Sequence, residues 1–146
     1  FCRTKRGVDE LVHELQAKGY MVEGMHGDMT QTHRLTTLNK FKEGTLSLLI
    51  ATDVAARGID IDALPHVVNF ELPNIAEDYV HRIGRTGRAD KTGVAISLIS
   101  PSEVEPKIEV ELLMNTEIKE LPIPEDLKIE ERYLDFEKEK KKMKFL

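Results

Sequence analysis

The sequence predicts an α/β domain in which a parallel sheet is sandwiched between helices. Two observations support this fold class. Short apolar runs alternate with segments of helical periodicity from residue 1 to about residue 100, as in successive βαβ units. One of these runs, residues 46–51, is apolar enough to be a central parallel strand that is covered on both faces. With 146 residues and no internal repeat, the chain fits one ordinary domain.

The first predicted helix presents one apolar face, formed by Val8, Leu11, Val12 and Leu15. Lys18 and Gly19 supply its basic last turn and its C-cap, and a short strand is expected at 21–25. A second helix is expected over 31–43, with Thr30 as its N-cap and Gly44 after its end. The residues expected on its inner face are Leu35, Leu38 and Phe41.

Strands are expected near 46–51 and 67–70, a helix at 75–83 and a further strand at 94–99. Ser100 and Glu103 form a capping-box pattern with a proline between them, which predicts a helix that runs to about residue 114. Residues 121–124 contain two prolines and are expected to be extended. The charged run at 137–144 is interpreted as a solvated helix or a linker.

Composition limits the classes of function. The single cysteine, Cys2, excludes an internal disulfide framework, and the five histidines lack metal-ligand spacing, so we expect no metal site and a reducing, cytoplasmic setting. No apolar stretch approaches the roughly 20 residues of a membrane helix, so no membrane contact is expected. The net charge of −5 is concentrated after residue 102, so any nucleic-acid site must be a local cluster of basic residues.

The strongest chemical signal is the segment H-R-I-G-R-T-G-R at 81–88. Arg82, Arg85 and Arg88 recur at every third position, and glycines between them allow close approach to another surface. Planar, permanently charged guanidinium groups in this arrangement suit phosphate oxygens. The alternative interpretation is the exposed basic end of a helix.

A second signal, A-T-D-V-A-A-R-G-I-D at 51–60, directly follows an expected strand. Loops at the carboxyl ends of parallel strands are where α/β sheets bind ligands. Thr52 and Asp53 are expected at that edge, and Arg57, Gly58 and Asp60 in the loop beyond it. The alternative is a polar connection without a ligand.

Together the two segments resemble motifs V and VI of the DEAD-box RNA helicases. Residues 1–5 are similar to the end of motif IV, and H-G-D at 26–28 with Q-x-x-R at 31–34 is similar to its extension. The resemblance covers residues 1 to about 103 and implies a RecA-like lobe. His81 favours this family over DEAH and RecQ-type helicases, which usually carry glutamine there. Residues 117–119 resemble the segment that follows this lobe in bacterial RhlE-type members.

The resemblance implies that residues 1–115 form the C-terminal lobe of a two-lobe enzyme, with part of its N-terminal side missing, and that 116–146 form a charged extension or linker. We expect an N-terminal RecA-like lobe of the same chain to be the lobe's partner. That lobe would provide the phosphate-binding loop and the ligands of Mg²⁺, since this sequence contains neither G-x-x-x-x-G-K-[ST] nor D-E-A-D.

The resemblance also implies roles for individual residues. Arg85 and Arg88 match the catalytic arginine fingers at the γ-phosphate of ATP, and Asp60, with Gly58 beside it, matches the ribose contact. The positions that match inter-lobe coupling are Arg57, His81 and Arg82. The positions that match contacts to the RNA phosphate backbone, which do not depend on base sequence, are Thr4, Gly27, Gln31, Arg34 and Thr52. For Arg34, the alternative is an ordinary surface arginine.

The function predicted from this resemblance is that of the C-terminal lobe of an ATP-dependent RNA helicase, inactive without its other lobe. A non-catalytic RNA- or protein-binding module and a DNA helicase lobe stay open as alternatives. The RNA target and the oligomeric state are left open.

Overall fold

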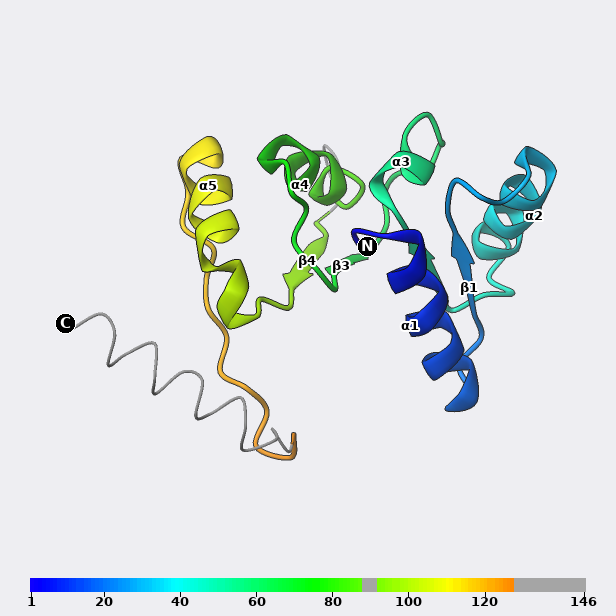
Figure 1. The fold of residues 1–146 in the computed structure, drawn as a ribbon, viewed down its shortest axis with the longest axis horizontal. Helices are drawn as coiled ribbons and strands as arrows, with labels where there is room; N and C mark the ends of the chain where they lie inside the picture. The colour runs from blue at the N-terminus through cyan, green and yellow to red at the C-terminus, as the bar shows by residue number, and fades with distance from the viewer. Residues whose placement is uncertain (88–91, 128–146) are drawn as a thin grey trace.

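The computed structural model describes residues 1–87 and 92–127, in which strands and helices alternate (Figure 1). The helices are α1 (Lys5–Ala17), α2 (Gln31–Lys42), α3 (Asp53–Ala56), α4 (Ala76–Ile83) and α5 (Val104–Met114), with a 3₁₀ turn, η1, at Pro101–Glu103. The strands are β1 (Val22–Met25), β2 (Leu48–Ala51), β3 (His66–Asn69) and β4 (Val94–Ser97). Parallel strands separated by helices confirm the predicted α/β class.

The described strands form two parallel pairs where the sequence predicted one sheet. β1 pairs with β2, and β3 pairs with β4. The first two residues connect the pairs. The Cys2 amide donates to the Ala51 carbonyl at 3.0 Å, and the Phe1 amino group donates to the Val68 carbonyl at 2.7 Å. Phe1 and Cys2 therefore lie between the carboxyl ends of β2 and β3.

An apolar groove of about 700 Å³ lies between β2 and β3, and its lining includes Phe1. The expectation that the strand at 46–51 is covered on both faces is therefore wrong. Leu48 is 38% exposed, and only Ile50 and Ala51 at the end of β2 are buried.

The core beside β1 and β2 is closed by α1. Its predicted apolar face is confirmed, because Val8 is fully buried and the other three residues of that face pack against the same cluster. A Cβ atom at Gly24 would lie 2.7 Å from Cγ1 of Val8, so the glycine allows α1 to approach β1 closely. A second cluster, of Leu72, Tyr79 and Val110, lies between α4 and α5.

The sequence predicted the helix caps correctly, but it did not predict the buried face of α2. The Thr30 side chain accepts from the His33 amide at 3.1 Å, and Ser100 and Glu103 make the predicted capping box. Leu35 was expected on the inner face of α2 and is 49% exposed. The buried face is centred on Thr37 and Leu38. Leu35 lies about 110° around the helix from that centre, because each residue turns an α-helix by about 100°.

Residues 117–124 contain neither helix nor strand, and the charged run at 137–144 lies outside the described residues. No helix in the described part of the chain is long and apolar enough to cross a membrane. Within 1–87 and 92–127, no group of three or more histidine, cysteine or acidic side chains could hold a metal ion.

Candidate functional site

The residues of the second sequence signal and most of the first come together at the carboxyl ends of β2 and β3. α3 begins directly after β2, and α4 follows β3 through a loop. Figure 1 shows α3 and α4 at the same edge of the molecule as the loop that leads from β1 into α2. Residues far apart in sequence therefore share one edge, which is where parallel sheets bind ligands.

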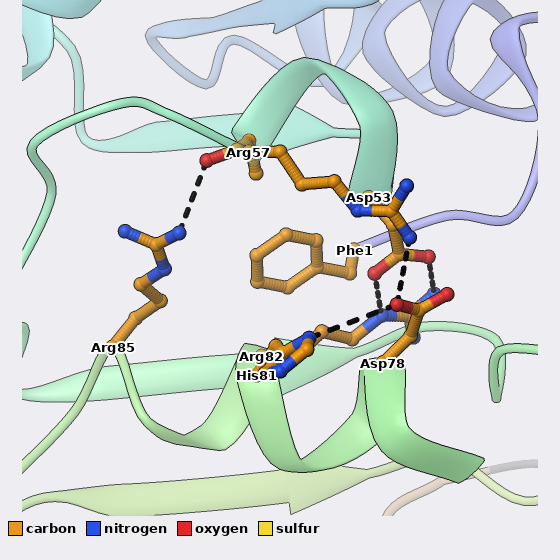
Figure 2. Close-up of a pocket in the computed structure, with 8 residues that line it drawn as sticks. Phe1, Asp53, Arg57, Asp78, His81, Arg82 and Arg85 are labelled. Atoms are coloured by element: carbon orange, nitrogen blue, oxygen red, sulfur yellow. Dashed lines mark hydrogen bonds and ion pairs between the residues drawn. The ribbon is translucent and has the colours of Figure 1, made fainter. Parts of the chain in front are cut away.

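Arg82, from α4, is the buried centre of this site. Its side chain is 1% exposed, and it donates from Nε and Nη2 to the two carboxylate oxygens of Asp53 at 2.6 and 2.8 Å. Nη1 donates to the Glu71 carbonyl at 2.5 Å and to Oδ1 of Asn69 at 3.3 Å. The guanidinium also lies 5.2 Å from the centre of the Phe1 ring (Figure 2). Arg82 thereby connects α4 with α3, with β3 and with the first residue.

Arg57 and His81 lie at the exposed side of the same site. Nη2 of Arg57 lies 2.8 Å from Oδ1 of Asp78, and Nδ1 of His81 lies 3.8 Å from that oxygen. The side chains of Arg57 and His81 are 58% and 72% exposed, whereas that of Asp78 is 13% exposed. A mostly buried carboxylate thus binds Arg57 and lies beside His81, and both of these side chains are exposed enough to reach a second surface (Figure 2).

Arg85 closes the other end of the site by bonding to backbone carbonyls. Its guanidinium donates to the carbonyls of Ala56, Ile59 and Ile61 at 3.1, 2.8 and 3.4 Å. These carbonyls belong to the end of α3 and to the loop that carries Gly58 and Asp60, both exposed. Gly58 has a φ of +71°, a conformation that favours glycine. Arg88 lies outside the described residues.

The residues predicted to face RNA lie mainly at the starts of α1 and α2. Thr4 is exposed, and its hydroxyl accepts from the Gly7 amide at 3.0 Å, which caps α1. Gly27 and Gln31 are exposed, and Arg34 is half-buried with its Nε lacking a partner among the described residues. Thr52 differs from the other four. It is buried, and its hydroxyl accepts from the Ala55 amide to cap α3.

Two side chains of α1 hold the loop between β1 and α2. Nε2 of the buried His26 lies 2.9 Å from Oδ1 of Asp9, and Nδ1 accepts from the Asp28 amide at 3.3 Å. The neutral ring with its proton on Nε2 satisfies both contacts. Nζ of Lys5 lies 2.7 Å from Oδ1 of Asp28, and this hydrogen bond holds the pKa of the Asp28 carboxyl below its usual value.

Sequence reasoning missed four residues that contact the arginines of the site. Asp78, Asn69, Glu71 and Phe1 were not assigned to it, although each contacts one of the predicted cationic residues. One available signal was the chemistry of burial, because a buried arginine needs carboxylate or carbonyl partners. For the loop after β1, the signal was the spacing of Lys5 and Asp9, which places both on one face of α1.

Residues 1–90 match the family of the helicase conserved C-terminal domain. The DEAD-box ATP-dependent RNA helicase CshA of Geobacillus kaustophilus is 59% identical over 104 residues, which cover 71% of this chain and 22% of that protein. The ATP-dependent RNA helicase CshA of Listeria monocytogenes is 57% identical over 104 residues, covering 71% and 20%. The chain therefore spans about a fifth of the length of these relatives.

Two solved structures resemble the fold. A DEAD box protein from the hyperthermophile Methanococcus jannaschii superposes with a TM-score of 0.79 at 44% identity, over 84% of this chain and 34% of that one. The Escherichia coli DEAD-box protein SrmB, in a structure bound to the regulator of ribonuclease activity A, gives a TM-score of 0.79 at 36% identity. That match covers 89% of this chain and 79% of the other.

Proposed function

The chain belongs to the helicase conserved C-terminal domain family and is the C-terminal lobe of a DEAD-box protein; on this premise we propose that it supplies one half of an ATP-dependent RNA helicase. The other half is an N-terminal RecA-like lobe of the same protein. The observation that carries the proposal is the cluster of Arg57, His81 and Arg85 at one edge of the lobe. Asp78 binds Arg57, His81 lies 3.8 Å from the same carboxylate, and backbone carbonyls bind Arg85. Cationic groups ordered in this way suit a surface that closes on phosphates.

The described residues fit a role as the closing half of a nucleotide site. Asp60 is exposed and can accept a ribose hydroxyl, and the space beside Gly58 is open, since a Cβ atom there would meet nothing within 4 Å. ATP supplies the phosphoanhydride bond whose hydrolysis drives remodelling. Arg85 would supply a planar cation to the charge that develops on the γ-phosphate, and its side chain would then exchange its carbonyl partners for phosphate oxygens.

The chain lacks a phosphate-binding loop, so nucleotide phosphates and Mg²⁺ are held mainly by the N-terminal lobe in this proposal. Arg57 and His81 couple the two lobes. Both are exposed and lie beside Asp78, which binds Arg57, so closure can bring them against the opposing lobe without a rearrangement inside this one.

RNA is proposed to lie across the starts of α1 and α2 and to be held by its phosphates. The first amides of α2 and the guanidinium of Arg34 favour an anion at that end of the helix. No aromatic side chain belongs to the predicted RNA-facing set, which suits contact with the backbone rather than stacking on bases. The RhlE-type resemblance of 117–119 stays a prediction.

The proposal is tested by measuring ATP hydrolysis for the chain alone and for the same chain joined to its N-terminal lobe. We expect no RNA-stimulated turnover from the chain alone and strong stimulation by RNA in the joined protein, because tethering raises the effective concentration of one half-site near the other. Substantial turnover by the isolated chain contradicts the proposal. Stimulation by DNA but not RNA favours a DNA helicase, and RNA binding without turnover in the joined protein favours a non-catalytic module.

A further inference from the structure

The last described helix, α5, carries apolar side chains on two opposite faces. Its inner face packs against α4 through the buried Val110. Its outer face carries Val104, Ile108 and Leu112, which form the outer stripe and are 39%, 47% and 76% exposed. Ile108 and Leu112 lie nearly opposite Val110, because each is two positions from it and a helix turns by about 100° per residue. A helix that is apolar on all sides is usually covered on all sides, so the outer stripe is a candidate docking surface.

Acidic side chains border the outer stripe. Glu105 and Glu109 are exposed, and each directly follows a residue of the stripe. In all, α5 contains three glutamates and one lysine, which gives a formal charge of −2. A segment that covers this face therefore needs apolar residues at helical spacing together with basic residues.

The chain contains such a segment after the last described residue. Ile129, Tyr133 and Phe136 have the spacing i, i+4, i+7, which places them on one face if the segment is helical. Residues 138–144 contain five lysines and one glutamate, a formal charge of +4. The pattern is thus complementary to that of the outer stripe in both spacing and charge.

The chain that leaves α5 returns along it. Ile118 packs against the cluster that contains Val110, and its amide donates to Oε1 of Glu111 at 2.8 Å. Figure 1 shows this part of the chain beside α5. Ile129 follows Ile118 by eleven residues, a reach of at most about 36–40 Å, whereas the 11 residues of α5 span about 16 Å. The segment that begins at 128 can therefore reach every point of the outer stripe.

We propose that the outer stripe binds residues 128–144 of the same chain as an amphipathic helix. Ile129, Tyr133 and Phe136 cover the stripe, and the lysines of 138–144 lie toward the glutamates of α5. A segment of this length is marginal as a helix by itself, so burial of its apolar face supplies most of the stabilisation. Exposed lysine–glutamate pairs contribute less to stability, and they set the preference for this partner.

Charge and entropy favour the attached segment over other occupants. A second copy of α5 would bring two faces of the same negative charge together. RNA is disfavoured for the same reason, because its phosphates would meet Glu105 and Glu109. A separate basic protein loses translational freedom on binding, whereas the attached segment is already held near α5 at an effective concentration of about millimolar order.

The test measures backbone order parameters of 129–136 by ¹⁵N NMR relaxation in the full chain. We expect values above about 0.8, as in the rigid lobe, and values below about 0.6 in Leu112→Asp, which places a charge in the middle of the contact. Leu112 is 76% exposed, so this change leaves the inner face of α5 packed. Leu35→Asp is the matched control, since it alters a 49% exposed leucine of another helix, and it should leave the order parameters unchanged.

Phe136→Asp removes the contact from the other side. It should lower the same order parameters and shift the amide resonances of Ile108 and Leu112, while those of α2 stay in place. Order parameters below about 0.6 in the unaltered chain overturn the proposal, as does retained order in Leu112→Asp or an equal loss in Leu35→Asp. If the order of 129–136 rises with protein concentration, another copy supplies the segment and the intramolecular contact is wrong. Since neither ATP nor RNA is present, the result does not depend on the proposed function.

Discussion

Arg82 and Asp53 form a two-bond ion pair inside the lobe, with Nε–Oδ1 and Nη2–Oδ2 distances of 2.6 and 2.8 Å. They are 29 positions apart, so the pair fixes α4 relative to α3. Arg57 extends from the end of α3 to Asp78 on α4, which gives the two helices a second connection at the surface. The cationic residues that face outward are therefore supported by a charged pair that faces inward.

Arg82→Ala is expected to lower the free energy of unfolding by about 3–5 kcal/mol, because it leaves the Asp53 carboxylate without its partner in a largely buried place. Urea unfolding followed by circular dichroism measures this. Arg57→Ala is the matched control. Arg57 makes one hydrogen bond from a side chain that is 58% exposed, whereas Arg82 is buried and makes four, so a smaller loss than for Arg82 is expected although Asp78 is itself mostly buried. Equal losses in the two variants contradict the distinction between a structural Arg82 and a surface Arg57.

The sequence correctly predicted features that depend only on neighbouring residues, such as helix caps. Thr30 and Ser100 identified their helix starts because a cap depends on residues within one turn. Burial depends on distant partners. Arg82 and Arg85 are each followed two positions later by a glycine, yet Arg82 is buried against Asp53, whereas Arg85 binds carbonyls of a loop. Nothing local distinguishes them, and the same holds for Leu35, whose exposure depends on how α2 lies against β1.

Acetylation of the Phe1 amino group is expected to change how stability depends on pH. Burial lowers the pKa of this group from about 8.0, so the folded chain releases the proton at a lower pH than the unfolded chain does. Between the two pKa values the unfolded state binds more protons, so stability rises with pH through that window and levels off above about 8. Acetylation removes this titration and keeps an N–H for Val68.

The measurement is urea unfolding of the free and acetylated chains at intervals between about pH 6 and pH 9. Groups common to both chains cancel in the difference between the two curves. The acetylated chain should gain most at the low-pH end and least above about pH 8. A difference that stays constant across the range contradicts a shifted pKa at Phe1.

His26 is expected to position the loop between β1 and α2 through two separable bonds. His26→Asn keeps an oxygen near the place of Nδ1 for the Asp28 amide, and His26→Gln keeps an N–H near the place of Nε2 for Asp9. If RNA binds at this loop, His26→Ala should weaken RNA binding more than either variant while leaving the KM for ATP within about twofold. Fluorescence anisotropy with a labelled RNA and steady-state kinetics of the two-lobe protein measure the two effects. Equal loss of RNA and ATP affinity indicates a general folding defect instead.

Arg34→Ala in the two-lobe protein should weaken RNA binding to a similar degree for every sequence. It should also flatten the plot of log affinity against log salt concentration by less than about one unit, since one phosphate contact is lost. Lys18 is the control, because it is exposed and caps the opposite end of α1 from the proposed RNA face. Lys18→Ala is expected to leave the slope unchanged. A loss at Arg34 that depends on base sequence indicates base recognition rather than a phosphate contact.

Arg85 is expected to act both in ATP hydrolysis and in holding the loop after α3, and different substitutions separate these two roles. If Arg85 is the proposed arginine finger, it stabilises charge in the transition state rather than the bound nucleotide, so Arg85→Ala in the two-lobe protein should lower kcat by at least about 10²-fold and change nucleotide affinity by less than about tenfold. Arg88→Ala is expected to behave in the same way.

Arg85 also holds the loop after α3 through three carbonyl oxygens, so its loss should lower the unfolding temperature as well as kcat. The two roles separate in Arg85→Lys. A lysine can still donate to a carbonyl and recover part of the stability, but its ammonium cannot reproduce the planar fork, so kcat should stay low. ATPase kinetics at saturating RNA, with thermal unfolding of each variant, measure both. If kcat recovers in step with stability in the lysine variant, Arg85 acts by ordering the loop, and the finger assignment passes to Arg88 alone.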